Sequence, residues 1–239
     1  MNPLAVSQSG LVAPSTFVLL HGAGGTPDYW RLVVPRLEQA GHRVVAVALP
    51  NWPGATLTDQ ADAIVAAAAG AERVVLVAQS MAGFCAPLCC DRLPVGWLVL
   101  VNAMIPRPGE TAGEWWDNTG QGDAARANDL RAGRDPDAPF DPMTVFLHDI
   151  PPDILDWVMA AESQDPVDSL FAERFGLDRW PEVPTTVLAG REDRLFPLEF
   201  QVRVARERLG LEVEPLPGGH LLALSQPDVL AERLLAGPR

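Results

Sequence analysis

Nearly uninterrupted apolar runs, many of them rich in β-branched residues, recur along the chain. Runs that do not alternate with polar positions are typical of strands buried on both faces of a parallel sheet. Six segments show this pattern: 16–21, 43–49, 73–78, 97–101, 185–189 and 211–216. The pattern therefore predicts about six mainly parallel strands.

Between these runs, apolar residues recur at the spacing of one helix face. The expected helices cover residues 27–40, 57–69, 81–93, 198–209 and 227–235. Because parallel strands need crossover connections, alternating strands and helices predict a sheet with helices on both faces. The expected fold class is α/β, doubly wound.

One long stretch, residues 106–184, interrupts this alternation with many prolines, glycines and acidic residues. Short helical patterns appear within it near 124–132, 143–148 and 151–162. Insertions of this length between consecutive strands usually carry function. We expect one domain, 1–239, in which 106–184 forms a helical cap over the carboxyl edge of the sheet, where α/β folds bind ligands.

Composition narrows the range of partners. A chain of 239 residues with a net charge of −13 is expected to bind neither nucleic acid nor a membrane surface, since both would repel it. All 18 basic residues are arginines, so lysine Schiff bases and lysine-dependent phosphate loops are excluded. The first 15 residues resemble neither a signal peptide nor a membrane anchor, which predicts a cytoplasmic protein.

Three cysteines lie close together in one expected helix. Cys85, Cys89 and Cys90 form no C-x-x-C pair and have no histidine cluster nearby. We expect them to be small buried hydrophobes, and we expect no metal site.

A serine follows the third apolar run in the segment Ala78-Gln79-Ser80-Met81-Ala82-Gly83. The segment is a degenerate G-x-S-x-G, with alanine at both glycine positions. Such a strand–turn–helix motif exposes a serine hydroxyl above the sheet. The alternative is a serine that merely caps a helix after a buried strand.

The first strand ends in His21-Gly22-Ala23, followed by two further glycines. A loop of small residues there allows a backbone N–H to turn inward. The N–H groups of Ala23 and Met81 are then the expected oxyanion hole beside Ser80. The alternative is an ordinary flexible turn.

Two further candidates follow the last two strands. Asp193 lies just past the fifth strand, with Glu192 as a weaker candidate, and His220 follows a glycine pair after the sixth. The chain order Ser80, Asp193, His220 is that of the Ser-Asp-His machinery of α/β-hydrolases. Each residue also falls at the carboxyl end of a strand, so we expect these three to form a catalytic triad.

With these motifs the chain resembles the α/β-hydrolase superfamily and, within it, the methylesterase and hydroxynitrile lyase group. Further matching segments are 29–30, 41–44, 98–106 and 146–149. The resemblance implies an α/β-hydrolase fold and an acyl-enzyme mechanism that requires no metal or organic cofactor. Lyases of this group carry a threonine and a lysine where this chain has Gly22 and Leu221. These two positions favour hydrolysis.

We therefore expect a serine esterase that acts on small, largely apolar carboxylic esters, as a monomer or homodimer. A receptor-like binding protein with little turnover, a C–C lyase and an acyltransferase remain alternatives, because they use the same residues. The residues expected to contact the substrate are Gly22, Trp115, Trp116, Phe146, Trp157 and Leu221.

Overall fold

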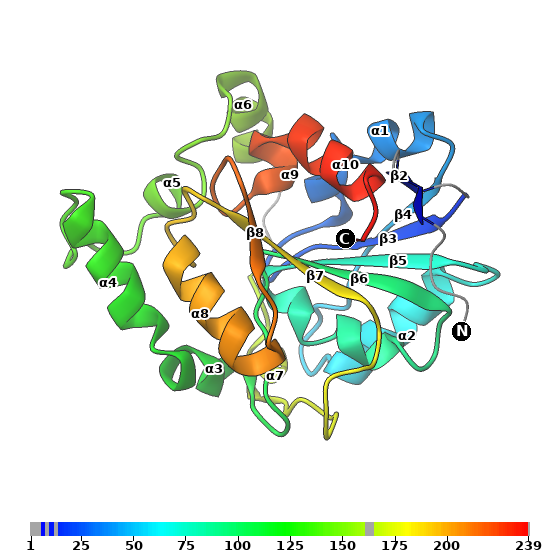
Figure 1. The fold of residues 1–239 in the computed structure, drawn as a ribbon. Helices are drawn as coiled ribbons and strands as arrows, with labels where there is room; N and C mark the ends of the chain where they lie inside the picture. The colour runs from blue at the N-terminus through cyan, green and yellow to red at the C-terminus, as the bar shows by residue number, and fades with distance from the viewer. Residues whose placement is uncertain (1–5, 8–9, 12–13, 161–164, 239) are drawn as a thin grey trace.

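A six-stranded, wholly parallel sheet forms the centre of the computed structural model (Figure 1). The structure describes residues 6–7, 10–11, 14–160 and 165–238. The strands follow the order β4-β3-β5-β6-β7-β8. Their bounds are β3 Thr16–Leu20, β4 Arg43–Val47, β5 Val74–Gln79, β6 Val95–Val101, β7 Thr185–Gly190 and β8 Val213–Leu216. The six expected strands and the α/β class are confirmed.

Two helical layers cover the sheet (Figure 1). Successive residues of a strand point to opposite faces, so Leu19 and Val77 join one core cluster while Val18 and Leu76 join the other. The first cluster includes side chains of α1, α9 and α10, and the second includes side chains of α2 and α8. These helices are α1 Val34–Gln39, α2 Leu57–Ala67, α8 Leu198–Leu209, α9 Leu222–Ser225 and α10 Pro227–Leu235.

Two expected helices are interrupted at prolines. The helix expected over 81–93 is instead a pair of short 3₁₀ turns, η2 Ser80–Gly83 and η3 Ala86–Cys89. Pro87 lacks an N–H and its ring conflicts with the carbonyl four residues earlier. The helix expected over 27–40 is likewise divided, into η1 Pro27–Trp30 and α1 with Pro35 in its first turn.

Between β6 and β7, the described residues form five helices: α3 Ala112–Thr119, α4 Gln121–Arg131, α5 Pro142–Val145, α6 Pro152–Ala160 and α7 Asp168–Ala172. The patterns near 124–132, 143–148 and 151–162 correspond to α4, α5 and α6, although positions 161–162 lie outside the described residues. Figure 1 shows α4, in green, farthest from the sheet on this side. The apolar pattern did not predict α3, which begins with a capping box between Thr111 and Glu114.

A buried ion pair connects this segment to α8. The guanidinium of Arg208 donates to both carboxylate oxygens of Glu110, and Asn118 Nδ2 also donates to Glu110, at 2.9 Å. The side chains of Arg208 and Glu110 are 2% and 4% exposed. The segment is thus attached to the sheet layer through a specific charged contact as well as apolar packing.

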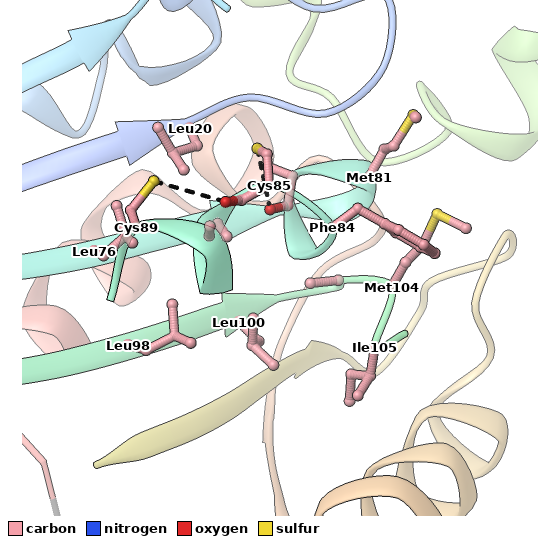
Figure 2. Packing of buried hydrophobic residues seen from close by; sticks show 14 of the residues in the cluster. Leu20, Leu76, Met81, Phe84, Cys85, Cys89, Leu98, Leu100, Met104 and Ile105 are labelled. Atoms are coloured by element: carbon pink, nitrogen blue, oxygen red, sulfur yellow. Dashed lines mark hydrogen bonds between the residues drawn. The ribbon is translucent and has the colours of Figure 1, made fainter. Parts of the chain in front are cut away.

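The residues after Ser80 pack tightly against the sheet. Figure 2 shows Phe84 and Cys85 in the apolar cluster that includes Leu76, Leu98 and Leu100. The three cysteines are buried, as expected, and burial raises the pKa of the Cys89 and Cys90 thiols to about 12. They remain protonated and act as small apolar side chains.

At the amino terminus, β1 Val6–Ser7 and β2 Gly10–Leu11 form an antiparallel pair that the sequence did not predict. The expectation that residues 1–15 contain no leader or anchor falls partly on residues outside the described ranges. Among the described residues, no helix has both the length and the apolar content that crossing a membrane requires.

Candidate active site

Ser80 occupies a strained turn directly after β5. Its φ is +52°, in the left-handed region that serine seldom adopts. The turn is locked by a hydrogen bond from the Met104 N–H to the Ser80 carbonyl, at 2.9 Å. Strain of this kind persists only where the surrounding structure imposes it.

The tightest approach beneath this turn occurs at Gly83. A Cβ on Gly83 would lie 1.9 Å from the Met104 carbonyl oxygen. Ala78 and Ala82 are accommodated with 0% and 2% exposure. The two alanines of the degenerate motif are therefore compatible with the turn, and Gly83 is the residue whose size is critical.

Ser80, His220 and Asp193 form a chain of two hydrogen bonds. Ser80 Oγ lies 3.2 Å from His220 Nε2, and His220 Nδ1 lies 2.8 Å from Asp193 Oδ2. His220 and Asp193 are each 2% exposed. An ionised carboxylate only accepts hydrogen bonds, so His220 carries its proton on Nδ1 and presents the Nε2 lone pair to Ser80.

The Asp193 carboxylate is itself fixed by its loop. Its Oδ1 accepts from the N–H groups of Leu195 and Phe196, at 2.9 and 2.8 Å. Glu192, the weaker candidate in the sequence, turns away and accepts from the Gly218 N–H. Of the two adjacent carboxylates, Asp193 is therefore the one in contact with the imidazole of His220.

The glycine-rich loop after β3 is held against the Ser80 turn. The Gly22 N–H donates to Gln79 Oε1 at 2.7 Å, and His21 Nδ1 lies 2.8 Å from the Gly22 carbonyl. The Leu49 N–H donates to His21 Nε2, so the ring proton is on Nδ1. Burial lowers the pKa of His21, which favours this neutral form.

Ala23 and Met81 lie on the wall of the same cavity as Ser80 and His220. Met81 is the second residue of η2, and the first N–H groups of a helix lack partners within it. Gly22 itself has no space for a side chain, because a Cβ would lie 2.5 Å from Gln79 Oε1 and 2.7 Å from Ser80 Cβ.

A cavity of about 490 Å³ opens above Ser80. It is large enough for a drug-sized molecule, and none of the described residues that line it is aspartate, glutamate or arginine. Five of the six residues expected to contact a substrate line it: Gly22, Trp116, Phe146, Trp157 and Leu221.

The expectation for Trp115 is wrong. It is 1% exposed, its ring packs against Phe196 and Phe200, and its Nε1 donates to the Ile105 carbonyl at 3.0 Å. Neighbouring positions on a helix face about 100° apart, so Trp116 faces the cavity while Trp115 anchors α3 to the core.

Asn102, directly after β6, is a site residue that the sequence did not predict. It has a φ of +45° and is fully buried. Its Oδ1 accepts from the Gly190 N–H at 2.7 Å, and its Nδ2 donates to the carbonyls of Gly219 and His220. The only signal in the sequence was a polar residue ending a buried strand, which did not reveal these contacts.

A model of the "Alpha/beta hydrolase family" matches residues 17–233. The chain belongs to the alpha/beta hydrolase family. This alpha/beta hydrolase thus has its serine, its histidine and its carboxylate at the carboxyl ends of β5, β8 and β7, as measured above.

The individual proteins to which this chain is similar are 22–35% identical to it over the matched residues. The alpha/beta hydrolase nvfD of Aspergillus novofumigatus is 25% identical over 244 residues, which cover 91% of this chain and 94% of that protein. The probable esterase PIR7A of Oryza sativa subsp. indica is 35% identical over 112 residues, covering 41% of this chain and 42% of that protein. The structure of polyneuridine aldehyde esterase is similar with a TM-score of 0.72 and 22% identity, covering 93% of this chain and 98% of that one. At that identity, the structural likeness shows the fold alone.

Proposed function

We propose that this alpha/beta hydrolase is a serine esterase that cleaves small, largely apolar carboxylic esters. The observation that carries the proposal is the hydrogen-bonded chain Ser80–His220–Asp193 at the floor of an uncharged cavity. The name of one relative, the probable esterase PIR7A, supports the same reaction class.

The proposed reaction begins at Ser80. His220 Nε2 takes the Ser80 proton while Oγ forms a bond to the ester carbonyl carbon, and Asp193 stabilises the resulting imidazolium. The N–H groups of Ala23 and Met81 stabilise the oxyanion. His220 then gives this proton to the alkoxy oxygen as its bond to the carbonyl carbon breaks, so an alcohol is released and an acyl group remains on Ser80.

Water completes the cycle by the reverse proton path. His220 removes a proton from water, the hydroxyl oxygen attacks the acyl carbon, and Ser80 Oγ leaves with the proton returned by His220. The products are a carboxylic acid and a restored enzyme. His220 accepts and returns the proton in each step of this scheme.

Two features support hydrolysis over the lyase and receptor alternatives. Neither Gly22 nor Leu221 brings a hydroxyl or an ammonium group into the cavity, as the lyases resembled by the sequence would require. A receptor with little turnover would be favoured if the alanines at 78 and 82 distorted the turn, but both are buried there and Ser80 Oγ remains 3.2 Å from His220 Nε2.

A test compares the wild type with Ser80→Ala on a panel of p-nitrophenyl esters of increasing acyl length. Loss of the nucleophile is expected to lower kcat at least about 10³-fold. A fluorophosphonate is expected to label the wild type once, at Ser80, by mass spectrometry. Equal turnover by both proteins, or labelling at another residue, would contradict the proposal.

A further inference from the structure

His220 lies on a loop whose backbone donates hydrogen bonds to two carboxylates. The Gly218 N–H donates to Glu192 Oε2, and the Gly219 N–H donates to Asp149 Oδ2 at 2.6 Å. Hydrogen bonds to charged acceptors are roughly twice as strong as neutral ones. The two peptide groups leading into His220 are therefore restrained by side chains from other segments of the chain.

Asn102 restrains the same loop through its carbonyl groups. Its Nδ2 donates to the carbonyls of Gly219 and His220, at 3.0 and 2.9 Å. Both the N–H and the carbonyl of Gly219 are thus hydrogen-bonded to side chains. The backbone conformation of the residue before the imidazole is set by contacts with Asp149 and Asn102.

Asp149 belongs to the 106–184 segment, and the same part of that segment also contacts the imidazole. The centroids of the Phe146 and His220 rings lie 5.4 Å apart. Outside this segment, the Phe196 ring also packs against the imidazole, at a centroid distance of 5.2 Å. Phe146 lines the substrate cavity as well. Residues 146–149 therefore contact the backbone before His220, its ring and the cavity at once.

The fit between Asp149 and the loop is close. A Cβ on Gly219 would lie 2.8 Å from Asp149 Oδ1 and 2.9 Å from His148 Nε2. Both of these polar atoms are buried, and neither has a hydrogen-bond partner among the described residues. Burying a carboxylate oxygen without a partner destabilises a fold, and such a group calls for an explanation.

We propose that Asp149 is a positioning residue for His220, an inference that rests on the proposed esterase function. By fixing the Gly219 peptide, its carboxylate holds the imidazole where Nε2 reaches Ser80 and Nδ1 reaches Asp193. Small misplacements of a reacting group cost about 10²-fold in rate. Asp149 acts through the backbone, since its Oδ2 accepts the Gly219 N–H.

The experiment compares Asp149→Ala and Asp149→Asn with the matched control Asp156→Ala, an exposed aspartate of α6. Asp149→Ala is expected to lower kcat for a p-nitrophenyl ester about 10- to 100-fold and to leave KM close to the wild-type value. Asp149→Asn retains an oxygen that accepts the Gly219 N–H, so most of kcat is expected to return. Asp156→Ala is expected to match the wild type.

Rates are expressed per active site, counted by complete fluorophosphonate labelling of Ser80, so that unfolded protein does not contribute. The rate of labelling is expected to fall in parallel with kcat. Wild-type kcat per active site in Asp149→Ala would overturn the inference, as would an equal loss in Asp149→Asn. A wild type that neither turns over esters nor reacts with the fluorophosphonate would overturn the proposed function, and this inference with it.

Discussion

At the scale of single residues, the Ser80 turn shows which small side chains the site needs. The expected motif has small residues at 78, 82 and 83. At Gly83, a Cβ would clash with the backbone, because it would lie 1.9 Å from the Met104 carbonyl oxygen. Ala78 and Ala82 fill ordinary core positions. The close approach between η2 and the chain after β6 therefore depends on Gly83.

Gly83→Ala is expected to destabilise the protein by about 1–3 kcal/mol, the range typical of overpacking. The displaced backbone would also move Ser80, so kcat should fall together with the thermal midpoint. A suitable comparison is Gly122→Ala in α4, where a Cβ meets nothing within 4 Å. That variant is expected to be neutral or slightly stabilising, and an equal loss in both would contradict the argument.

At the scale of elements, prolines explain why two helices predicted as continuous are divided. The apolar spacing after Ser80 is helical, but Pro87 divides the element into η2 and η3. The strands, in contrast, were located to within about two residues, because strands buried on both faces leave nearly continuous apolar runs. Residues such as Trp115 and Trp116 could not be separated, since each is apolar and only packing distinguishes an anchor from a cavity wall.

The buried ion pair between Arg208 of α8 and Glu110 connects two elements and is expected to stabilise the fold. Glu110→Ala leaves Arg208 buried without its carboxylate, which is expected to cost about 3–5 kcal/mol of unfolding free energy in urea. Glu212→Ala removes an exposed pair with Arg206 and is expected to change stability by less than about 1 kcal/mol. Similar losses in the two variants would show that the buried pair has no special role.

The same pair predicts a dependence on pH. Burial raises the pKa of Glu110, but hydrogen bonds from Arg208 and Asn118 outweigh it and hold the pKa below the ordinary 4.5. A lowered folded-state pKa contributes stability that is fully present above about pH 4.5 and is lost as pH falls through the lowered value. Glu110→Gln is expected to flatten the acid limb of the unfolding free energy, as measured by urea titrations at successive pH values.

At the scale of the whole molecule, the candidate site combines segments that are far apart in sequence. Ser80, Asp193 and His220 could be predicted because each follows a recognisable strand in the expected order. Asn102 and Asp149 could not, because their roles depend on hydrogen bonds to loop backbone from distant segments. Sequence patterns identify the reactive groups more readily than the groups that hold them in place.

The cavity walls include two indoles from different helices, Trp116 of α3 and Trp157 of α6. Trp157 also lies 4.3 Å from the guanidinium of Arg31, while Trp116 packs against Phe196. Because an indole's emission responds to the polarity around it, these contrasting surroundings give the protein two optical reporters of its own. Titrating Ser80→Ala with an apolar ester should change the intrinsic fluorescence, and Trp116→Phe and Trp157→Phe should each remove part of that change. If both Trp→Phe variants keep the full fluorescence change on titration, the ester binds outside this cavity.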